Sequence, residues 1–255
     1  MLTSGYSEEH RTHVLTATFP RTDGYSCPEF VDTAMHERSS RFRVYRVVEA
    51  VGHINLFDTD GTRLYTTYQS GYGERQPAVD ALETGDLIEG TVAGDPDDSD
   101  EAWSLREFER IGGVDMGFAT DVELPEIARE TWASGGGGEP AHSVIEEDGT
   151  PVGECWVQPR APLPGGSFVP SVLAGLLPME ERLTTVESAD APTTDAVFLD
   201  PDPVDATTFS EPYGVVLLFT EDGAETRRRY RERYDCSRGV DSRPDYDPYE
   251  LTRGP

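Results

Sequence analysis

The chain has 255 residues, and its 49 acidic residues outnumber its 21 basic residues, which gives a formal net charge of −28. Every basic residue is arginine, because the sequence contains no lysine. An apolar share of 36% with three tryptophans is enough for a hydrophobic core, which excludes a wholly disordered acidic chain. No apolar run reaches the roughly 20 residues of a membrane-spanning helix, and the first residues lack the basic-then-apolar order of a secretory signal.

The charge and the cysteines predict where the protein works. Surface carboxylates keep a protein hydrated and dispersed when molar salt screens their mutual repulsion. We therefore expect a cytoplasmic protein of a salt-accumulating halophile, although a GC-rich genome would also favour arginine over lysine. Three widely separated cysteines, Cys27, Cys155 and Cys236, suit a reducing compartment and are expected to be packing residues.

Residues 1–40 are polar and show no hydrophobic period, so we expect a disordered arm there. Met35 stands just before the first strand pattern and is a candidate for the true first residue. Residues 1–34 would then not be translated. Peptides from residues 1–34 in the native protein would contradict that start.

Residues 41–133 are predicted to form a β-barrel domain. Alternating and β-branched runs predict five strands, at residues 41–49, 53–58, 62–69, 87–92 and 103–111. Asp58-Thr59-Asp60-Gly61 is the expected hairpin turn between the second and third strands. Five short strands of this kind are typical of a closed or partly open barrel such as the OB fold, and residues 83–92 resemble an OB-type strand entry. A short helix is expected at residues 121–132, with Pro125 near its first turn.

The Gly-rich residues 134–140 are predicted to be a linker, and residues 141–235 a second domain. This domain is expected to contain a hairpin (142–147 and 152–158), a helix (167–177), two strands (196–199 and 214–219) and a charged helix (221–234). The order is β-β-α-β-β-α, in which two helices could cover one face of a four-stranded antiparallel sheet. Residues 236–255 have no period and are expected to form an extended tail.

No pattern predicts a catalytic residue, a metal site or a cofactor. Asp58 and Gly61 resemble the opening of a calcium loop, but Gly61 comes two residues early and Arg63 stands where a ligand is needed. Residues 165–167 (Gly-Gly-Ser) do not form a phosphate loop, because no lysine follows, and helix capping explains them. The many carboxylates carry no information, since the sequence does not separate buried acids from solvated ones.

Arginines and tyrosines are interleaved in the predicted barrel. The candidate binding residues there are Arg43, Tyr45, Arg63, Tyr65, Tyr68 and Arg75. Residues two apart on a strand share a face, so the pairs Arg43/Tyr45 and Arg63/Tyr65 could form one surface. Tyrosine and guanidinium groups stack on bases, which predicts binding of RNA or single-stranded DNA. The alternative is that the tyrosines pack the sheet and the arginines pair with neighbouring acids.

A second basic feature is the predicted helix with the run ETRRRYRER at residues 225–233, whose net charge is +3. Its candidate binding residues are Arg227, Arg228 and Arg231. This helix could contact RNA, an acidic partner or the acidic remainder of the same molecule. Basic residues late in a helix also interact favourably with its dipole.

The runs RFRVYRVVEAVGHINLFDTDG, GVVLLFTEDGAETRRRYRERYDC and RPDYDPYE resemble a family of uncharacterised haloarchaeal proteins of unknown function. The resemblance extends from about Arg41 to Glu250 and leaves out the first 40 residues. It implies a haloarchaeal lineage and a cytoplasmic location, and it implies no particular activity.

We therefore expect an α+β protein, in which an OB-like five-stranded barrel precedes a β-β-α-β-β-α domain. Its expected role is that of a non-enzymatic binding or adaptor protein without a cofactor. The expected partner is nucleic acid or a nucleic-acid-associated protein, and no membrane. The alternatives are a pure protein–protein interaction module, with residues 236–255 as one contact, and an enzyme of unrecognised type.

Overall fold

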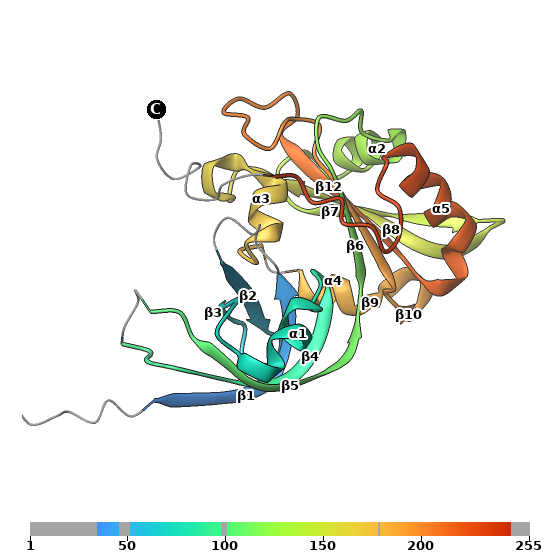
Figure 1. The fold of residues 1–255 in the computed structure, drawn as a ribbon. Helices are drawn as coiled ribbons and strands as arrows, with labels where there is room; N and C mark the ends of the chain where they lie inside the picture. The colour runs from blue at the N-terminus through green and yellow to red at the C-terminus, as the bar shows by residue number, and fades with distance from the viewer. Residues whose placement is uncertain (1–34, 46–51, 98–100, 178, 246–255) are drawn as a thin grey trace, which may run out of the picture. The chain divides into compact units, whose positions relative to one another are not determined.

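The computed structural model describes residues 35–45, 52–97, 101–177 and 179–245 of the chain (Figure 1). Contacts divide the chain into two units, Met1–Thr33 and Ala34–Pro255, and the described residues belong to the second. The predicted arm at residues 1–34 therefore lies outside the described residues. Residues 36–40 differ from the prediction, because they begin the first strand.

The first sheet contains five strands in the order β3-β2-β1-β4-β5, and all neighbours are antiparallel. The strands are β1 (His36–Tyr45), β2 (His53–Asp58), β3 (Arg63–Tyr68), β4 (Asp86–Gly94) and β5 (Ser104–Gly113). A 3-10 turn η2 (Gly73–Arg75) and the short helix α1 (Gln76–Asp80) connect β3 to β4. The five predicted strands of the first half are therefore present with bounds that differ by a few residues, and residues 46–49 of the first predicted strand lie outside the described residues.

The two ends of this sheet approach each other without closing. Thr67 of β3 forms an isolated parallel bridge with Trp103, the residue before β5. Two backbone hydrogen bonds make the bridge: Tyr68 N–H donates to the Trp103 carbonyl at 3.0 Å, and Trp103 N–H donates to the Thr66 carbonyl at 2.8 Å. The described strands form an open sheet rather than a closed barrel, so the expected closed form is not observed.

Side chains on one face of the first sheet form its own hydrophobic core. These buried residues are Phe42, Val44, Ile54, Leu56, Tyr65, Val79, Leu82, Ile88, Val92, Trp103 and Leu105. The strand alternation explains the set, because Phe42 and Val44 lie opposite Ile88 and Leu56 across the ladder. The side chains of β1 that alternate with them point to the other face.

The second sheet also contains five strands, in the order β6-β11-β12-β8-β7. They are β6 (Asp115–Ala119), β7 (Ala141–Glu147), β8 (Thr150–Pro159), β11 (Asp195–Leu199) and β12 (Tyr213–Phe219). The four predicted strands are present, and β6, which the sequence did not predict, adds a fifth that runs parallel to β11. The prediction places residues 115–133 in the first domain. In the structure β6 pairs within the second sheet, with only Val114 between it and β5, and α2 packs on β8.

Helices lie on both faces of the second sheet rather than on one. Helices α2 (Glu126–Ser134) and α5 (Ala224–Arg233) pack on the face that carries Val197, Val215 and Leu217. On the opposite face lie α3 (Phe168–Leu173) and α4 (Glu180–Thr184), with buried Phe168 and Leu183. The remaining elements are η3 (Pro164–Gly166), β9 (Thr185–Val186), η4 (Glu187–Ala189), β10 (Ala191–Pro192) and η5 (Glu221–Gly223).

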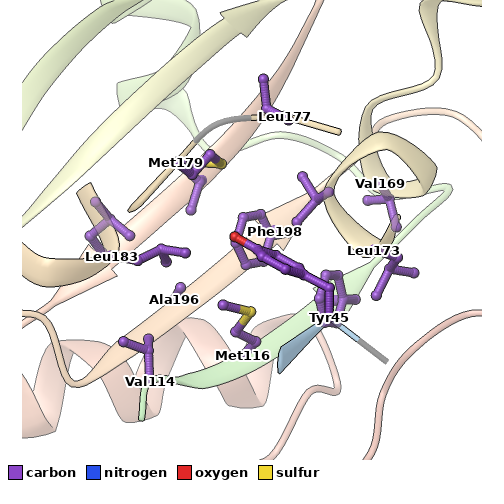
Figure 2. Close-up of a cluster of buried hydrophobic side chains, with 14 of the residues drawn as sticks. Tyr45, Val114, Met116, Val169, Leu173, Leu177, Met179, Leu183, Ala196 and Phe198 are labelled. Carbon is purple, nitrogen blue, oxygen red and sulfur yellow. The ribbon is translucent and has the colours of Figure 1, made fainter. Parts of the chain in front are cut away.

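One hydrophobic cluster joins the two sheets. Figure 2 shows Tyr45 of β1 among Met116, Leu173 and Phe198, which come from β6, α3 and β11. Phe57 of β2 belongs to the same cluster. The outer face of the first sheet is thus packed against the second sheet and its helices. None of the described helices is long and apolar enough to cross a membrane.

Candidate functional site

Two of the candidate binding residues, Arg43 and Tyr45, lie inside the protein. Arg43 is 3% exposed and Tyr45 is 1% exposed. Arg43 Nε donates to the Glu180 carboxylate at 3.2 Å and Arg43 Nη1 donates to the Gly85 carbonyl at 2.9 Å. The Tyr45 hydroxyl donates to Glu180 at 3.0 Å, and burial, followed by the charge of Glu180, raises the pKa of Tyr45. These two side chains hold α4 against β1 and are not available to a ligand.

The strand register shows why the expected joint Arg/Tyr surface does not form. Arg43 pairs with Phe57, and Phe57 pairs with Leu64. Directly paired residues point to the same face of a sheet, so Arg43 and Tyr45 share a face with Leu64. Arg63 and Tyr65 alternate with Leu64 and therefore point to the opposite face. The expectation that Arg43/Tyr45 and Arg63/Tyr65 form one surface is wrong for this reason.

The outer face of β2 and β3 is covered by the segment that follows α3. Asn55 Nδ2 donates to the Ala174 carbonyl at 2.9 Å, and the Thr66 hydroxyl donates to Asn55 Oδ1 at 3.1 Å. A Cβ atom built on Gly175 would lie 2.8 Å from Leu64 Cδ1, so the Gly175 backbone packs directly against the Leu64 side chain. Gly175 also has φ +71°, which a residue with a side chain adopts rarely. This face therefore binds the protein's own chain.

The other barrel candidates meet where β3 approaches the start of β5. We call this region the seam. It comprises Arg63, Tyr72, Arg75 and Arg106, together with Tyr68 at the end of β3, whose side chain points to the same side of the strand as Leu64 and away from Arg63. The Tyr72 hydroxyl donates to the Tyr68 carbonyl at 2.7 Å and accepts from the Leu105 amide at 3.2 Å. Arg75 Nη1 donates weakly to the Leu105 carbonyl at 3.5 Å, and its guanidinium lies 5.8 Å from the centre of the Tyr72 ring. The loop after β3 is thereby fixed to β5.

Aromatic rings line the seam. The Arg63 guanidinium lies 5.0 Å from the Tyr65 ring centre and 5.8 Å from that of Trp103, and these two rings pack edge to face. Tyr65 is buried, whereas Tyr68 is 37% exposed and packs its ring against His53. Burial raises the pKa of the half-buried Tyr72. The seam therefore presents exposed guanidinium groups beside aromatic rings.

The arginines of the seam have no acidic partner. In the described chain, an ion pair within 4.0 Å is missing only for Arg63, Arg75, Arg106, Arg182, Arg229 and Arg233. The first three belong to the seam. Two further exposed arginines without an ion pair, Arg229 and Arg233, lie on α5. The guanidinium groups of the seam are free to bind an external anion.

The candidate arginines of α5 mostly contact the protein's own acids. Arg227 and Arg231 are buried, and each places a guanidinium nitrogen 3.0 Å from the fully buried carboxylate of Asp195. Arg231 also pairs with Asp115 at 2.7 Å. Arg228 is exposed, and it pairs along the helix with Glu225 and with Glu232, each at 2.7 Å. Of the three interpretations of this helix, the contacts match the one in which it binds the acidic remainder of the same molecule.

Two cavities lie on either side of Arg238. One, of about 390 Å³, is lined by α5 and by Ser237 and Arg238. The other, of about 370 Å³, lies between residues 80–86, the end of β5, the start of β6 and residues 238–243. Asp195 lies beneath Arg238, and burial raises its pKa although three arginines act in the opposite direction. The lining of the second cavity mixes acids and arginines, so it has no single charge preference.

The buried acids outside the seam are tied to structural partners. Arg160 donates to Asp200 and Asp202, and its guanidinium lies 4.2 Å from the Phe209 ring centre. Glu154 accepts hydrogen bonds from the Trp156 indole at 2.8 Å and from the Ser188 amide at 2.7 Å. No group of three metal-ligating side chains occurs among the residues that the structure describes.

Sequence reasoning missed Arg106 as part of the seam and Trp103 as the ring beside Arg63. Both belong to or precede β5, whose approach to β3 depends on a bridge between residues 36 positions apart in sequence. Tyr72 lies close to Arg75 in sequence, so its place beside the candidates could be predicted. Nothing in the local pattern around Arg106 could have indicated its neighbours. No protein-family model, no curated protein and no solved structure matches this chain.

Proposed function

We propose that this protein is a non-enzymatic binding protein for single-stranded nucleic acid, RNA or single-stranded DNA, which it holds at the seam. The observation that carries the proposal is a set of three arginines without an acidic partner: Arg63 and Arg75, which lie beside aromatic rings, and Arg106. Guanidinium groups bind phosphates in a bidentate manner, and exposed tyrosines stack on bases. Tyr72 supplies a ring beside Arg75, and Tyr68 supplies an exposed ring on the other side of the end of β3.

The arrangement of the first sheet supports the proposal. An OB fold is a five-stranded, partly open barrel that binds oligonucleotides and oligosaccharides. The strand order, the helix between β3 and β4 and the parallel approach of β3 to the start of β5 favour such an OB-like barrel here. The outer face of β2 and β3 is filled by residues 174 and 175, so the proposed site is the seam at the edge of β3 instead.

The acidic composition favours a protein that works in molar salt in a haloarchaeal cytoplasm. At such salt the release of counterions from phosphates adds little affinity, because the bulk concentration of ions is already high. Stacking on the tyrosines, at about 1–3 kcal/mol per base, and direct arginine contacts would then carry the binding. This predicts an affinity that falls little as the salt concentration is raised further.

The test is binding of a fluorescent single-stranded oligonucleotide, followed by anisotropy in molar KCl. Tyr68→Ala should weaken binding roughly tenfold or more, because it removes a stacking surface. Arg75→Gln should also weaken it, since the side chain keeps its polarity and loses its charge. Arg41→Gln is the matched control: Arg41 is an exposed arginine of the same sheet, but it is paired with Asp60 at 2.6 Å.

Ultraviolet crosslinking of the protein from its host, followed by peptide mapping, gives an independent measurement. Crosslinks on the peptide that contains Tyr68 and Tyr72 would support the seam. If the oligonucleotide binds and the Arg41 variant loses as much affinity as the Arg75 variant, the site lies elsewhere. If no oligonucleotide binds and protein partners co-purify in a nuclease-insensitive manner, the protein is an interaction module instead.

A further inference from the structure

The two edges of the second sheet differ in how they are protected. At the β6 edge, residues after α5 cover the strand: the Phe118 amide donates to the Ser242 hydroxyl at 2.9 Å, and the Gly239 amide donates to Asp115 at 2.8 Å. At the other edge, β7 pairs with β8 on one side only. Among the described residues, no backbone group of β7 has a backbone partner outside that pairing. An unprotected edge of this kind is a template for another strand.

The devices against edge pairing in β7 are confined to its end, where Glu146 and Glu147 stand and the ladder with β8 shifts register between Ile145 and Glu146. Ala141–Glu147 contains no proline, its first five residues carry no carboxylate or arginine, and its central residue, Val144, is 39% exposed. Side chains of β7 alternate, so His142, Val144 and Glu146 share one face. Ser143 and Glu147 point to the other face, where they contact Thr131 of α2 and Thr226 of α5. One face of β7 is therefore occupied, and the other is open.

We propose that β7 pairs with β7 of a second copy of this chain, antiparallel and centred on Val144, to form a symmetric dimer with one continuous ten-stranded sheet. A two-fold axis perpendicular to the sheet relates such strands, so paired residues must lie at equal distances from the axis. Centring on Val144 pairs the strand over its whole length. Val144 then meets Val144 of the partner subunit, which buries an exposed apolar side chain on both copies.

Charge complementarity selects this register and this partner. The pairing places His142 opposite the partner's Glu146 twice, once on each side of the axis. An imidazole N–H donates to a carboxylate whether or not the ring carries a charge. His142 is already held in place, because its ring stacks on Trp156 at 4.3 Å between ring centres. The guanidinium of Arg182 lies 4.2 Å from the same ring and must occupy its other face.

The edge strand β5 of the first sheet cannot pair with a second copy of itself in the same way. In β5 the charged residues Arg106, Glu107, Glu109 and Arg110 follow one another around Phe108. Self-pairing centred on Phe108 would put arginine opposite arginine and glutamate opposite glutamate. Centring on either glutamate would put like charges opposite each other at the axis, which is destabilising. The charge pattern of β5 thus prevents the contact that the pattern of β7 permits.

The experiment measures the molar mass of the full chain by light scattering and sedimentation over a concentration series in molar KCl. The wild-type protein should be a dimer that dissociates on dilution. Glu146→Arg should raise the dimer dissociation constant by about tenfold or more, because the carboxylate that accepts the His142 hydrogen bond is lost at two places. The double variant His142→Glu with Glu146→Arg restores opposite charges and should regain most of the affinity. Val144→Asp should be monomeric.

The control is Glu109→Arg, the same charge change on the exposed edge of β5, which should leave the dissociation constant unchanged. Circular dichroism of each variant separates loss of pairing from loss of folding. A wild-type protein that is monomeric at every concentration overturns the proposal. So does a double variant that dissociates as readily as Glu146→Arg, or a Val144→Asp protein that remains a dimer. Oligonucleotide binding at the seam does not enter this measurement, so the two proposals can fail separately.

Discussion

Replacement of Arg43 by methionine distinguishes a structural arginine from a binding arginine. Methionine fills a similar volume but removes the hydrogen bonds to Glu180 and to the Gly85 carbonyl. Loss of one partner of a buried ion pair costs about 3–5 kcal/mol. The Glu180 side chain is 14% exposed and keeps its bond from Tyr45, which reduces the expected loss to about 2–3 kcal/mol. This corresponds to a fall in Tm of roughly 4–12 °C for a chain of this size.

Urea unfolding in molar KCl, followed by tryptophan fluorescence, measures the change. Arg41→Met is the control, because Arg41 lies two residues away on the same face of β1, is 55% exposed and should leave the unfolding midpoint unchanged. Oligonucleotide affinity of the folded Arg43 variant should equal that of the wild type. If the Arg43 variant keeps its stability but loses oligonucleotide binding, Arg43 is a binding residue and its proposed structural role is refuted.

Three further outcomes follow from packing and from buried ionisable groups. Gly214→Ala should destabilise the protein by about 1–3 kcal/mol, because a Cβ atom there would overlap the Phe168 ring. Gly112→Ala is the control: a Cβ atom there meets nothing within 4 Å, so the substitution should have no effect. Burial alone would raise the pKa of Asp58, but hydrogen bonds to its carboxylate hold that pKa below its usual value. The carboxylate therefore stabilises the fold above about pH 4, and this stabilisation is lost as the pH falls through the lowered pKa. Acid titration of Asp58→Asn should lack this component. Burial raises the pKa of the Cys155 thiol to about 12, so alkylation at pH 8 should require denaturant, as mass spectrometry can show.

The elements were predictable where hydrophobic period and turn chemistry agree. The turn at residues 58–61 and the one at Asp148-Gly149 fix two hairpins, and the structure has β2 with β3 and β7 with β8 there. The run at residues 214–219 is apolar on both faces because helices cover both sides of β12. The sequence predicted that two helices, those seen as α3 and α5, cover a single face, since nothing in either helix states which side of the sheet it covers.

The composition of the site was only partly predictable for a related reason. Arg43 and Arg63 look alike in sequence, since each stands two residues before a tyrosine. Their surroundings differ because the register of β1, β2 and β3 points Arg43 toward Glu180 and Arg63 toward Trp103. Glu180 lies 137 positions from Arg43, so the ion pair depends on tertiary packing and has no local signal. A strand pattern assigns side chains to a face but does not say what covers that face.

The connection between β5 and β6, which is the single residue Val114, affects how the protein responds to cleavage and to unfolding. The chain leaves the first sheet at Gly113 and enters the second at Asp115, so it crosses between them almost without a connecting loop. Cleavage within the glycine run at residues 135–138 would leave β6 and α2 on the amino-terminal fragment, although both pack with the carboxy-terminal one. The two fragments should therefore stay associated after cleavage and reassemble from separately produced pieces, and a single cooperative transition should unfold both sheets.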